Sequence, residues 1–349
     1  EIYLNQRYGS HQFRWGNQLF ELGTLDFDSP LDTLHYRNLT GFFSLDPEKT
    51  RESMPAARYD WFGNNRRLTV YASPIAKTTF GMRVTRLREN AQAQGVGEDP
   101  EPSPLLRDYF GAQYQWLWAE SDLRLGFFHW FDSSPKISWR YEEASGLDAQ
   151  DAFLSLVESY KEEERSVNFA TLEWDVSFDT IGWKTDLGLF DRKNVYDYQQ
   201  TADGNVQFET VRVPHLGVAT SVEKTLPYFF AMVIYSYRLH YGVPAGSQLL
   251  LYENEATPVD TERDVAKHGL TGVARWRLWQ DHSAGLAVNQ TWPFDLTTVF
   301  ANWTWNRPAA RSSWTIKLLN MSTAKLEMTG EPIRSSQVFL IYTRTFVGS

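Results

Sequence analysis

Large apolar side chains recur at every second position in segments of about ten residues, and this alternation constrains the fold more than any other feature of the chain. In one such segment the apolar parity carries Leu172, Trp174, Val176 and Phe178. The other parity carries Thr171, Glu173, Asp175 and Ser177. Successive side chains of a strand point to opposite faces, so one face of this segment suits lipid and the other suits water. The pattern is typical of a transmembrane β-barrel.

Composition and charge argue against several other classes of protein. The chain has no cysteine, so a secreted form would depend on backbone pairing and apolar burial instead of disulfides. The longest apolar run, Tyr228 to Tyr235, is far shorter than the ~20 residues of a membrane-spanning helix. A net charge of -9 argues against a nucleic-acid partner. The chain starts at Glu1 without a basic and apolar leader, and we expect a mature form from which an export signal has been removed.

The alternating segments continue without a break in composition, which predicts one domain over residues 1–349. They run from Ala56 to Phe346 and include Thr79 to Arg88, Lys136 to Glu143 and Ala324 to Thr329, with one or two further strands within Glu1 to Gly23. We therefore expect an all-β fold, a transmembrane antiparallel β-barrel of about 16 strands, with about 14 or about 18 as alternatives.

Short and long connections are expected at opposite ends of this barrel. Two-residue turns are predicted at Asn64-Asn65, Ser121-Asp122 and Asp179-Thr180. Longer polar links are predicted at Glu89 to Asp108, Ala144 to Gln150, Arg192 to Gly204 and Val243 to Lys267. Short turns on one side and long loops on the other are typical of outer-membrane barrels.

Charged side chains indicate which parity faces the lumen. A Lys or Arg at the bilayer midplane costs roughly 2–4 kcal/mol, so cations that alternate with tryptophan should point inward. This places Trp174, Trp276 and Trp314 toward lipid and Lys317 toward the lumen. It predicts the following charged residues on the lumen wall: Arg58, Asp60, Lys184, Asp186, Arg275 and Arg277. Such charges would select solutes by charge and size.

Two segments do not follow the alternation. Both parities carry aromatic residues in Phe127 to Phe131, and both are apolar in Phe230 to Ile234. The favoured interpretation is a strand whose inner side is packed by a loop or plug. The other interpretation is an apolar patch on the inner wall that holds an apolar substrate.

The segment from Leu25 to Pro55 shows little alternation and is rich in charged groups. It fits an inward-folded loop that narrows the barrel, and it fits a solvated external loop equally well. Pro30 and Pro47 would permit short helical turns. In the inward interpretation the charged residues of this segment oppose those of the wall. The candidates are Asp26, Asp28, Asp32, His35, Arg37 and Arg51.

Short motifs in the N-terminal part of the chain carry a family resemblance. They are Arg14-Trp15-Gly16, Ser29-Pro30-Leu31-Asp32, Leu45-Asp46-Pro47-Glu48, Ser53-Met54-Pro55-Ala56-Ala57-Arg58 and Ser73-Pro74. On these motifs the chain resembles a porin-like family of Gram-negative outer-membrane proteins. That family is known mainly as a domain of unknown function and is often linked to lipid, sterol or hydrocarbon traffic. The resemblance implies a single-chain outer-membrane barrel with an inward-folded segment after the first strands, and it identifies no substrate.

Catalytic and metal-binding patterns are weak. None of the seven histidines has His-x-x-x-His spacing, and there is no Gly-x-Ser-x-Gly, phosphate-binding Gly-rich loop or nucleotide fingerprint. Paired carboxylates such as Glu142-Glu143 are expected at solvated strand ends or loops. We therefore expect no enzyme activity, no catalytic residues, no metal and no cofactor.

These features favour an outer-membrane channel for passive or facilitated passage of a solute or an apolar compound. The alternative is a structural or partner-binding barrel that forms the outer-membrane part of an envelope transport or export assembly. A soluble, aromatic-rich β-sandwich that binds carbohydrate ranks third. The expected partners are outer-membrane lipid, a solute and, in the alternative, an envelope protein. Parity does not predict the oligomeric state.

Overall fold

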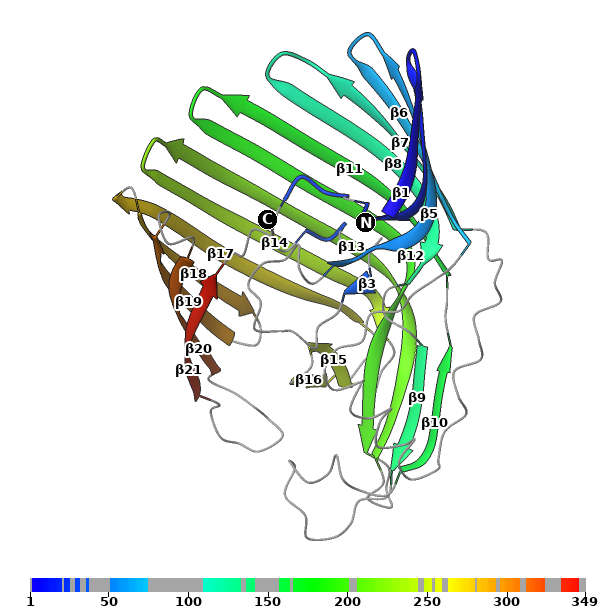
Figure 1. Cartoon of the computed structure of the whole chain (residues 1–349). Coiled ribbons are helices and arrows are strands. Elements are labelled where there is room, and N and C mark those ends of the chain that lie inside the picture. Colours follow the sequence, from blue (N-terminus) through cyan, green and yellow to red (C-terminus); the bar gives the residue numbers. More distant parts are fainter. Residues whose placement is uncertain are drawn as a thin grey trace.

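The computed structural model describes most of the chain as β-strand (Figure 1). The described residues are 2–20, 22–25, 29–31, 36–37, 51–74, 109–132, 136–141, 157–163, 166–200, 206–243, 248–252, 255–258, 263–279, 281–292, 296–307, 312–323 and 334–344. Within these ranges the structure contains no helix, so none is long and apolar enough to cross a membrane. The predicted all-β fold is confirmed.

One antiparallel sheet of 19 strands contains almost all of these elements. Four of its strands form two extra hairpins, and the other fifteen pair consecutively to form a curved wall (Figure 1). The wall strands are β1 (Ile2–Tyr8), β2 (His11–Gln18), β5 (Met54–Gly63), β6 (Arg66–Ser73), β7 (Tyr109–Leu117), β8 (Ser121–Phe131), β11 (Ser166–Phe178), β12 (Ile181–Gln200), β13 (Val206–Leu226), β14 (Phe229–Val243), β17 (Arg263–Trp279), β18 (His282–Trp292), β19 (Leu296–Arg307), β20 (Ser312–Thr323) and β21 (Arg334–Arg344). The described pairings leave β1 and β21 as the two edges of the wall.

Two hairpins lie beside the wall and were not predicted. They are formed by β9 (Lys136–Tyr141) with β10 (Val157–Glu163) and by β15 (Gln248–Tyr252) with β16 (Glu255–Pro258). The expectation that Lys136 to Glu143 forms a wall strand is therefore wrong, because β8 pairs directly with β11 while β9 pairs with the far end of β13. A separate two-stranded sheet joins β3 (Tyr36–Arg37) to β4 (Arg51–Glu52). The expected strands Thr79 to Arg88 and Ala324 to Thr329 lie outside the described residues.

The predicted short turns are confirmed at two of three positions. Asn65 and Asp179 adopt positive φ angles of 56° and 50°, as tight hairpin turns require. The third turn is misplaced, because Ser121 already begins β8 and its carbonyl accepts a hydrogen bond from the Trp118 amide. The turn therefore lies at residues 119–120.

Two of the predicted long links are shorter than expected. β12 continues through most of the expected Arg192 to Gly204 link as far as Gln200, because a register shift between Phe190 and Lys193 interrupts the alternation without ending the strand. The link from Val243 to Lys267 contains β15, β16 and the start of β17. The links Glu89 to Asp108 and Ala144 to Gln150 lie outside the described residues.

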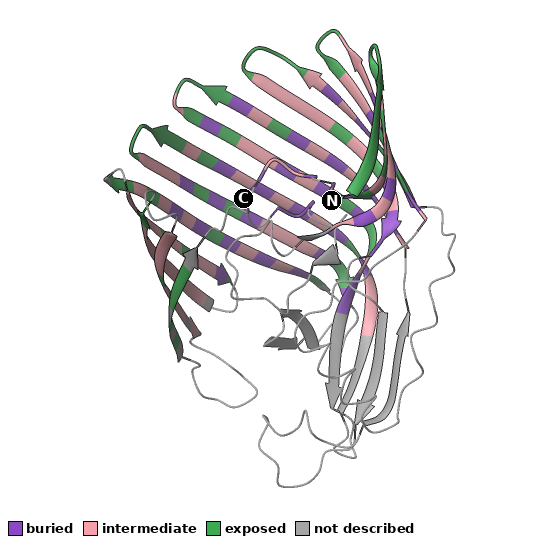
Figure 2. Ribbon diagram, in the orientation of Figure 1, coloured by how far each residue is buried: buried purple, intermediate pink, exposed green. Residues whose placement is uncertain are grey.

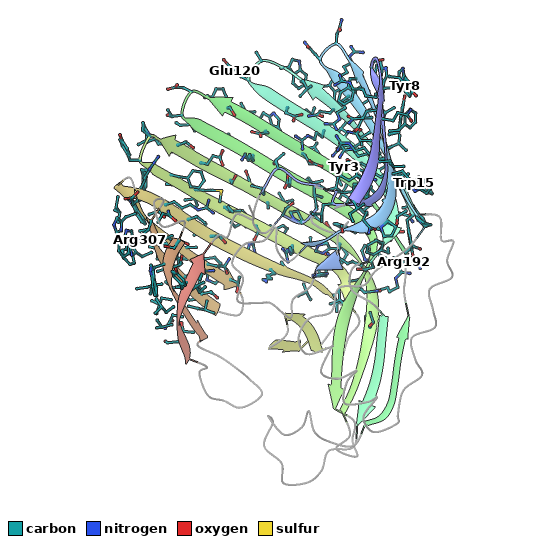
Figure 3. All side chains as sticks on the ribbon, viewed as in Figure 1. Tyr3, Tyr8, Trp15, Glu120, Arg192 and Arg307 are labelled. Atoms are coloured by element: carbon teal, nitrogen blue, oxygen red, sulfur yellow. The ribbon has the colours of Figure 1, made fainter. Side chains whose placement is uncertain are left out.

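The register fixes a common outer face along the wall. Along the strands exposed residues alternate with more buried ones (Figure 2), and the described side chains project from both faces of the sheet (Figure 3). Exposed aromatic and aliphatic residues recur on this face from strand to strand. Trp174 is 40% exposed on β11, and Val338 and Leu340 are 70% and 66% exposed on β21. Trp276 shares the outer parity of Leu278, and Trp314 pairs across strands with Tyr342.

The buried side chains lie on the opposite, inner face. The largest apolar cluster joins aromatic residues of β6, β7, β8, β11 and β12, including Tyr71, Trp130 and Phe169. A second cluster joins Ala219, Met232, Ile234 and Val273 on β13, β14 and β17. Both clusters also contain residues that follow β2, so the chain after β2 lies against the inner wall.

Candidate functional site

The chain after β2 covers part of the inner wall, and this region is the candidate functional site. We name residues 19–31 the inner segment, of which 19–20, 22–25 and 29–31 are described. Phe20, Leu22 and Leu31 are buried in the larger apolar cluster, and Leu25 is buried in the second. Leu25 and residues 29–31 of the predicted inward loop therefore lie against the inner wall.

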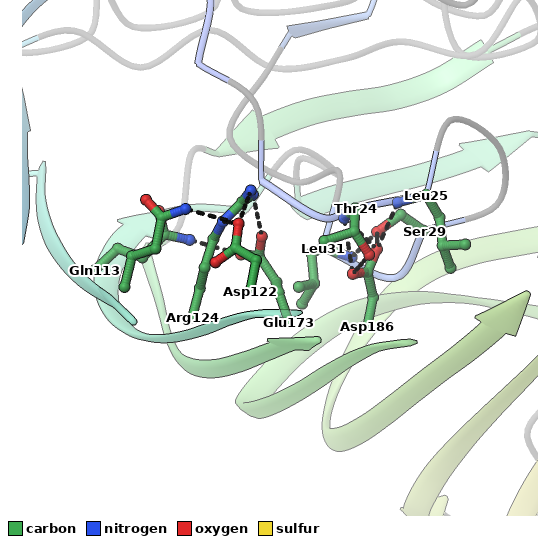
Figure 4. A network of polar contacts seen from close by, with 10 residues as sticks. Thr24, Leu25, Ser29, Leu31, Gln113, Asp122, Arg124, Glu173 and Asp186 are labelled. Carbon is green, nitrogen blue, oxygen red and sulfur yellow. Dashed lines mark hydrogen bonds and ion pairs between the residues drawn. The ribbon is translucent and has the colours of Figure 1, made fainter. Parts of the chain in front are cut away.

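Asp186 on β12 anchors the inner segment through its carboxylate (Figure 4). The Thr24 amide donates to Oδ1 at 2.8 Å and to Oδ2 at 3.0 Å, and the Thr24 hydroxyl donates to Oδ1 at 2.9 Å. The Leu25 amide and the Ser29 hydroxyl donate to Oδ2 at 3.2 and 2.7 Å. Asp186 is fully buried, so these donors replace water around its charge.

The backbone of the inner segment bends tightly at this anchor. Gly23 has a φ of +93°, which side-chain-bearing residues rarely adopt. A Cβ at this position would lie 2.4 Å from Ser29 Oγ and 2.6 Å from Asp186 Oδ2. The Ser29 hydroxyl also accepts a hydrogen bond from the Leu31 amide at 3.2 Å. The described part of the expected helical start at Ser29 is thus a turn held by a side chain.

A pair of glycines makes room for the next two residues of the segment. Gly188 on β12 and Gly217 on β13 are register partners on the inner face. A Cβ on Gly217 would lie 2.4 Å from Pro30 Cβ, and one on Gly188 would lie 2.8 Å from Leu31 Cδ2. The glycine pair therefore forms a shallow seat for Pro30 and Leu31.

The apolar contacts of the segment account for the two regions where alternation fails. The inward Phe128 and Trp130 are fully buried, and Phe20 contacts Trp130 edge-on with ring centroids 6.4 Å apart. Met232 and Ile234 are buried in the cluster that contains Leu25. These observations favour the packed interpretation, because side chains of the inner segment cover both inner patches.

Charged groups on the inner wall beside this segment are paired with one another (Figure 4). Glu173 is fully buried and accepts hydrogen bonds from Gln113 at 2.7 Å and from Arg124 at 3.2 Å. Arg124 also pairs with Asp122 at 2.7 Å. Arg124 is therefore shared between the two carboxylates of this network.

Asp60 forms a second paired cluster on β5 and β6. Its carboxylate accepts from Arg58 at 3.0 Å, from Arg67 at 2.9 Å and from the Thr69 hydroxyl at 2.7 Å. The Asp60 side chain is fully buried. Its negative charge is therefore shared among these three donors.

The predicted site residues therefore divide into several groups. Asp26, Asp28, Asp32 and His35 lie outside the described residues. Arg37 and Arg51 are register partners in β3 and β4. Asp60 and Asp186 face inward as expected but are fully buried, which excludes them as solvated wall charges in this conformation. Lys184 pairs with Glu223 at 3.2 Å, whereas Arg275 and Arg277 are exposed.

Sequence reasoning missed Gly23, Thr24, Gly188 and Gly217. The inner parity of Gly188 and Gly217 could be inferred from the alternation of β12 and β13, but their role depends on which segment lies opposite them. His215 and His240 were considered only by sequence spacing, and the register places them side by side with ring centroids 4.4 Å apart. No group of three or more potential metal ligands occurs in the part of the chain that the structure describes.

Comparison with known proteins shows only distant similarity. A porin structure refined at 1.8 Å resolution matches with 12% identity and a TM-score of 0.42, covering 86% of this chain and 79% of the porin. A mutant of the ferric enterobactin receptor from Pseudomonas aeruginosa matches with 10% identity and a TM-score of 0.41, covering 78% of this chain and 42% of the receptor. No family model and no curated protein matches the chain. Its function is therefore argued from its own geometry.

Proposed function

We propose that this chain is an outer-membrane β-barrel protein whose lumen allows passive passage of a solute. The observation that carries the proposal is the division of the wall into an apolar, exposed outer face and an inner face that carries paired charges and a folded-in segment. An outer apolar surface with a polar interior is the arrangement of membrane barrels.

The outer face is too apolar and too continuous for a protein surrounded by water. Exposed large side chains occupy it from β1, where Ile2 and Leu4 are 84% and 78% exposed, through Trp174 on β11 to Leu340 on β21. Soluble monomers rarely expose contiguous apolar patches larger than about 300–600 Å². The hydrocarbon core of a membrane is the environment that matches this apolar face.

The proposal requires the two edges of the wall to meet in the membrane. Unpaired backbone groups cost several kcal/mol each in hydrocarbon, which open sheet edges cannot avoid. Because fifteen strands pair consecutively and antiparallel, β1 and β21 run in the same direction. A direct seam between these two edges would therefore be parallel.

Reversing the polarity of one outward position tests the orientation of the wall. Leu318 on β20 points outward and is 39% exposed, whereas its neighbour Leu319 points inward. Leu318→Arg should lower the free energy of unfolding in lipid vesicles by roughly 2–4 kcal/mol. The matched variant Leu319→Arg should cost clearly less. Equal effects of the two substitutions would contradict the proposed lipid face.

Conductance of the reconstituted protein tests passage through the lumen. The purified chain, inserted into planar lipid bilayers, should give discrete conductance steps in KCl. A correctly inserted barrel without such steps, with or without the Asp186→Ala substitution that frees the inner segment, would rule out the channel. That result would favour the alternative of a partner-binding barrel in an envelope assembly.

A further inference from the structure

We propose that the lumen selects anionic solutes through a basic strip formed by Arg275, Arg277 and Lys317 on the inner face of β17 and β20. The inference rests on the proposed channel and names the class of solute that it passes. The strip differs from the other charged clusters described on the wall, because its cations have no acidic partner among the described residues.

The charges of the wall are divided between its two parts. Within the strands β14 and β17–β21 the only acidic residue is Asp264, near the start of β17, and Asp281 lies in the turn that joins β17 to β18. The Asp264 carboxylate accepts a hydrogen bond from the Gly242 amide at 2.9 Å. The inward carboxylates of Asp60, Glu173 and Glu223 all lie on strands before β14, where each meets a cation. No ion pair joins Arg275, Arg277 or Lys317 to another described residue.

The register places Arg275 and Lys317 in one row across the inner face of the sheet. Arg275 pairs with Gly285, which pairs with Asn302, which pairs with Lys317. Three strand spacings separate Arg275 from Lys317, or about 14 Å between Cα atoms. Arg277 lies on the same face, two residues nearer the short turn that joins β17 to β18. The cations thus border a stretch of wall made of short side chains.

The three cations are available to a solute. Arg275 and Arg277 are exposed, Lys317 is half-buried, and none of them forms an ion pair with another described residue. The Arg275 guanidinium lies 5.8 Å from the Phe230 ring centroid, a contact that positions the cation without neutralising it.

The described part of the inner segment does not reach the stretch of wall that carries Arg275. The apolar cluster that holds Leu25 reaches Val273 on β17 and Ala287 on β18. Arg275 and Gly285 lie two residues beyond these positions, toward the short turns. A solute that passes the inner segment therefore meets the basic strip. Lys and Arg groups that line a pore lower the energy of an anion and raise that of a cation, which selects anions such as chloride, phosphate and small carboxylates.

Reversal potentials in planar bilayers test the selectivity directly. With KCl at different concentrations on the two sides, the sign of the wild-type reversal potential should show that chloride permeates better than potassium. The triple substitution R275E/R277E/K317E should change the chloride-to-potassium permeability ratio by about an order of magnitude or more and reverse the sign. The neutral triple R275Q/R277Q/K317Q should abolish most of the chloride preference, and it keeps the test valid if the acidic variant does not fold.

A control variant changes the net charge by the same amount outside the lumen. Arg66, Lys224 and Arg307 are exposed, have the outward parity and lie near the same short turns. R66E/K224E/R307E should leave the permeability ratio close to the wild-type value. A potassium-selective wild-type channel, or a ratio that the two triple substitutions of the strip leave unchanged, would overturn the inference while the channel itself stands. Absence of any conductance would instead overturn the proposed function.

Discussion

Asp186→Ala should release the inner segment and increase the conductance of the channel. The Asp186 carboxylate accepts hydrogen bonds from the amides of Thr24 and Leu25 and from the hydroxyls of Thr24 and Ser29. Hydrogen bonds to a charged group contribute about 1.5–3 kcal/mol each and do not add fully, so we expect a loss of about 3 kcal/mol. That loss corresponds to roughly a hundredfold change in the equilibrium between docked and released segment.

Cysteine labelling measures the release independently of conductance. The chain has no cysteine, so a single cysteine at Leu22, which is 4% exposed, reports on the inner segment alone. A water-soluble maleimide should label Leu22→Cys slowly when Asp186 is present and much faster when Asp186→Ala is added. The two backgrounds share the reporter, so its own effect on docking cancels in the comparison.

A substitution in the glycine seat should have the same effect by a different route. Gly217→Val would place side-chain atoms where Pro30 lies, since a Cβ alone would come within 2.4 Å of Pro30 Cβ. Gly272→Val is the matched control, because a Cβ on Gly272 meets nothing within 4 Å. Labelling rates that neither Asp186→Ala nor Gly217→Val raises would show that the segment is held by other contacts.

Asp60→Ala should destabilise the barrel by about 3 kcal/mol, at the lower end of the range for removing one partner of a buried ion pair. The substitution leaves Arg58 and Arg67 facing each other without their shared carboxylate, and it leaves the Thr69 hydroxyl without its acceptor. The side chains of the two arginines are 15% and 26% exposed, so water recovers part of the loss. Urea unfolding in lipid vesicles, followed by tryptophan fluorescence, measures the change.

Glu223→Ala provides the control for the Asp60 prediction. Glu223 pairs with Lys184 at 3.2 Å, and both side chains are 20% exposed. A partly solvated single pair is worth about 0–1 kcal/mol, so this variant should unfold close to the wild type. Equal losses for the two variants would contradict the view that complete burial and multiple donors make the Asp60 cluster the stronger of the two.

The alternation of side chains was sufficient to predict the wall and the direction of its faces. Trp174 and Arg275 illustrate why. The alternation of side chains can be read within a single segment of the sequence, and the cost of a charged side chain in hydrocarbon decides which set of alternate positions faces lipid. Local patterns could not show that β12 continues beyond its register shift at Phe190, nor that β9 lies outside the wall. Both depend on which strand pairs with which, and that pairing is a long-range property.

The candidate site was only partly predictable for the same reason. Asp186 lies on the inner face of β12, but its burial follows from contacts with Thr24 and Ser29, which lie far away in the sequence. Gly188 and Gly217 form a seat only because the register places them side by side. The loss of alternation in Phe127 to Phe131 and in Phe230 to Ile234 was the local sign that something covers the inner wall.

The anchor of the inner segment also determines when that segment can reach its place during folding. Thr24 and Asp186 are separated by 162 positions in the chain, and Gly217 and Met232, which border the docked segment, lie further on. Contacts between such distant residues cost much loop entropy and form late. The segment therefore docks after β12, β13 and β14 have paired, although it precedes all three strands in the chain. In the proposed channel, docking of the segment would therefore set the width of the lumen only after these strands have formed.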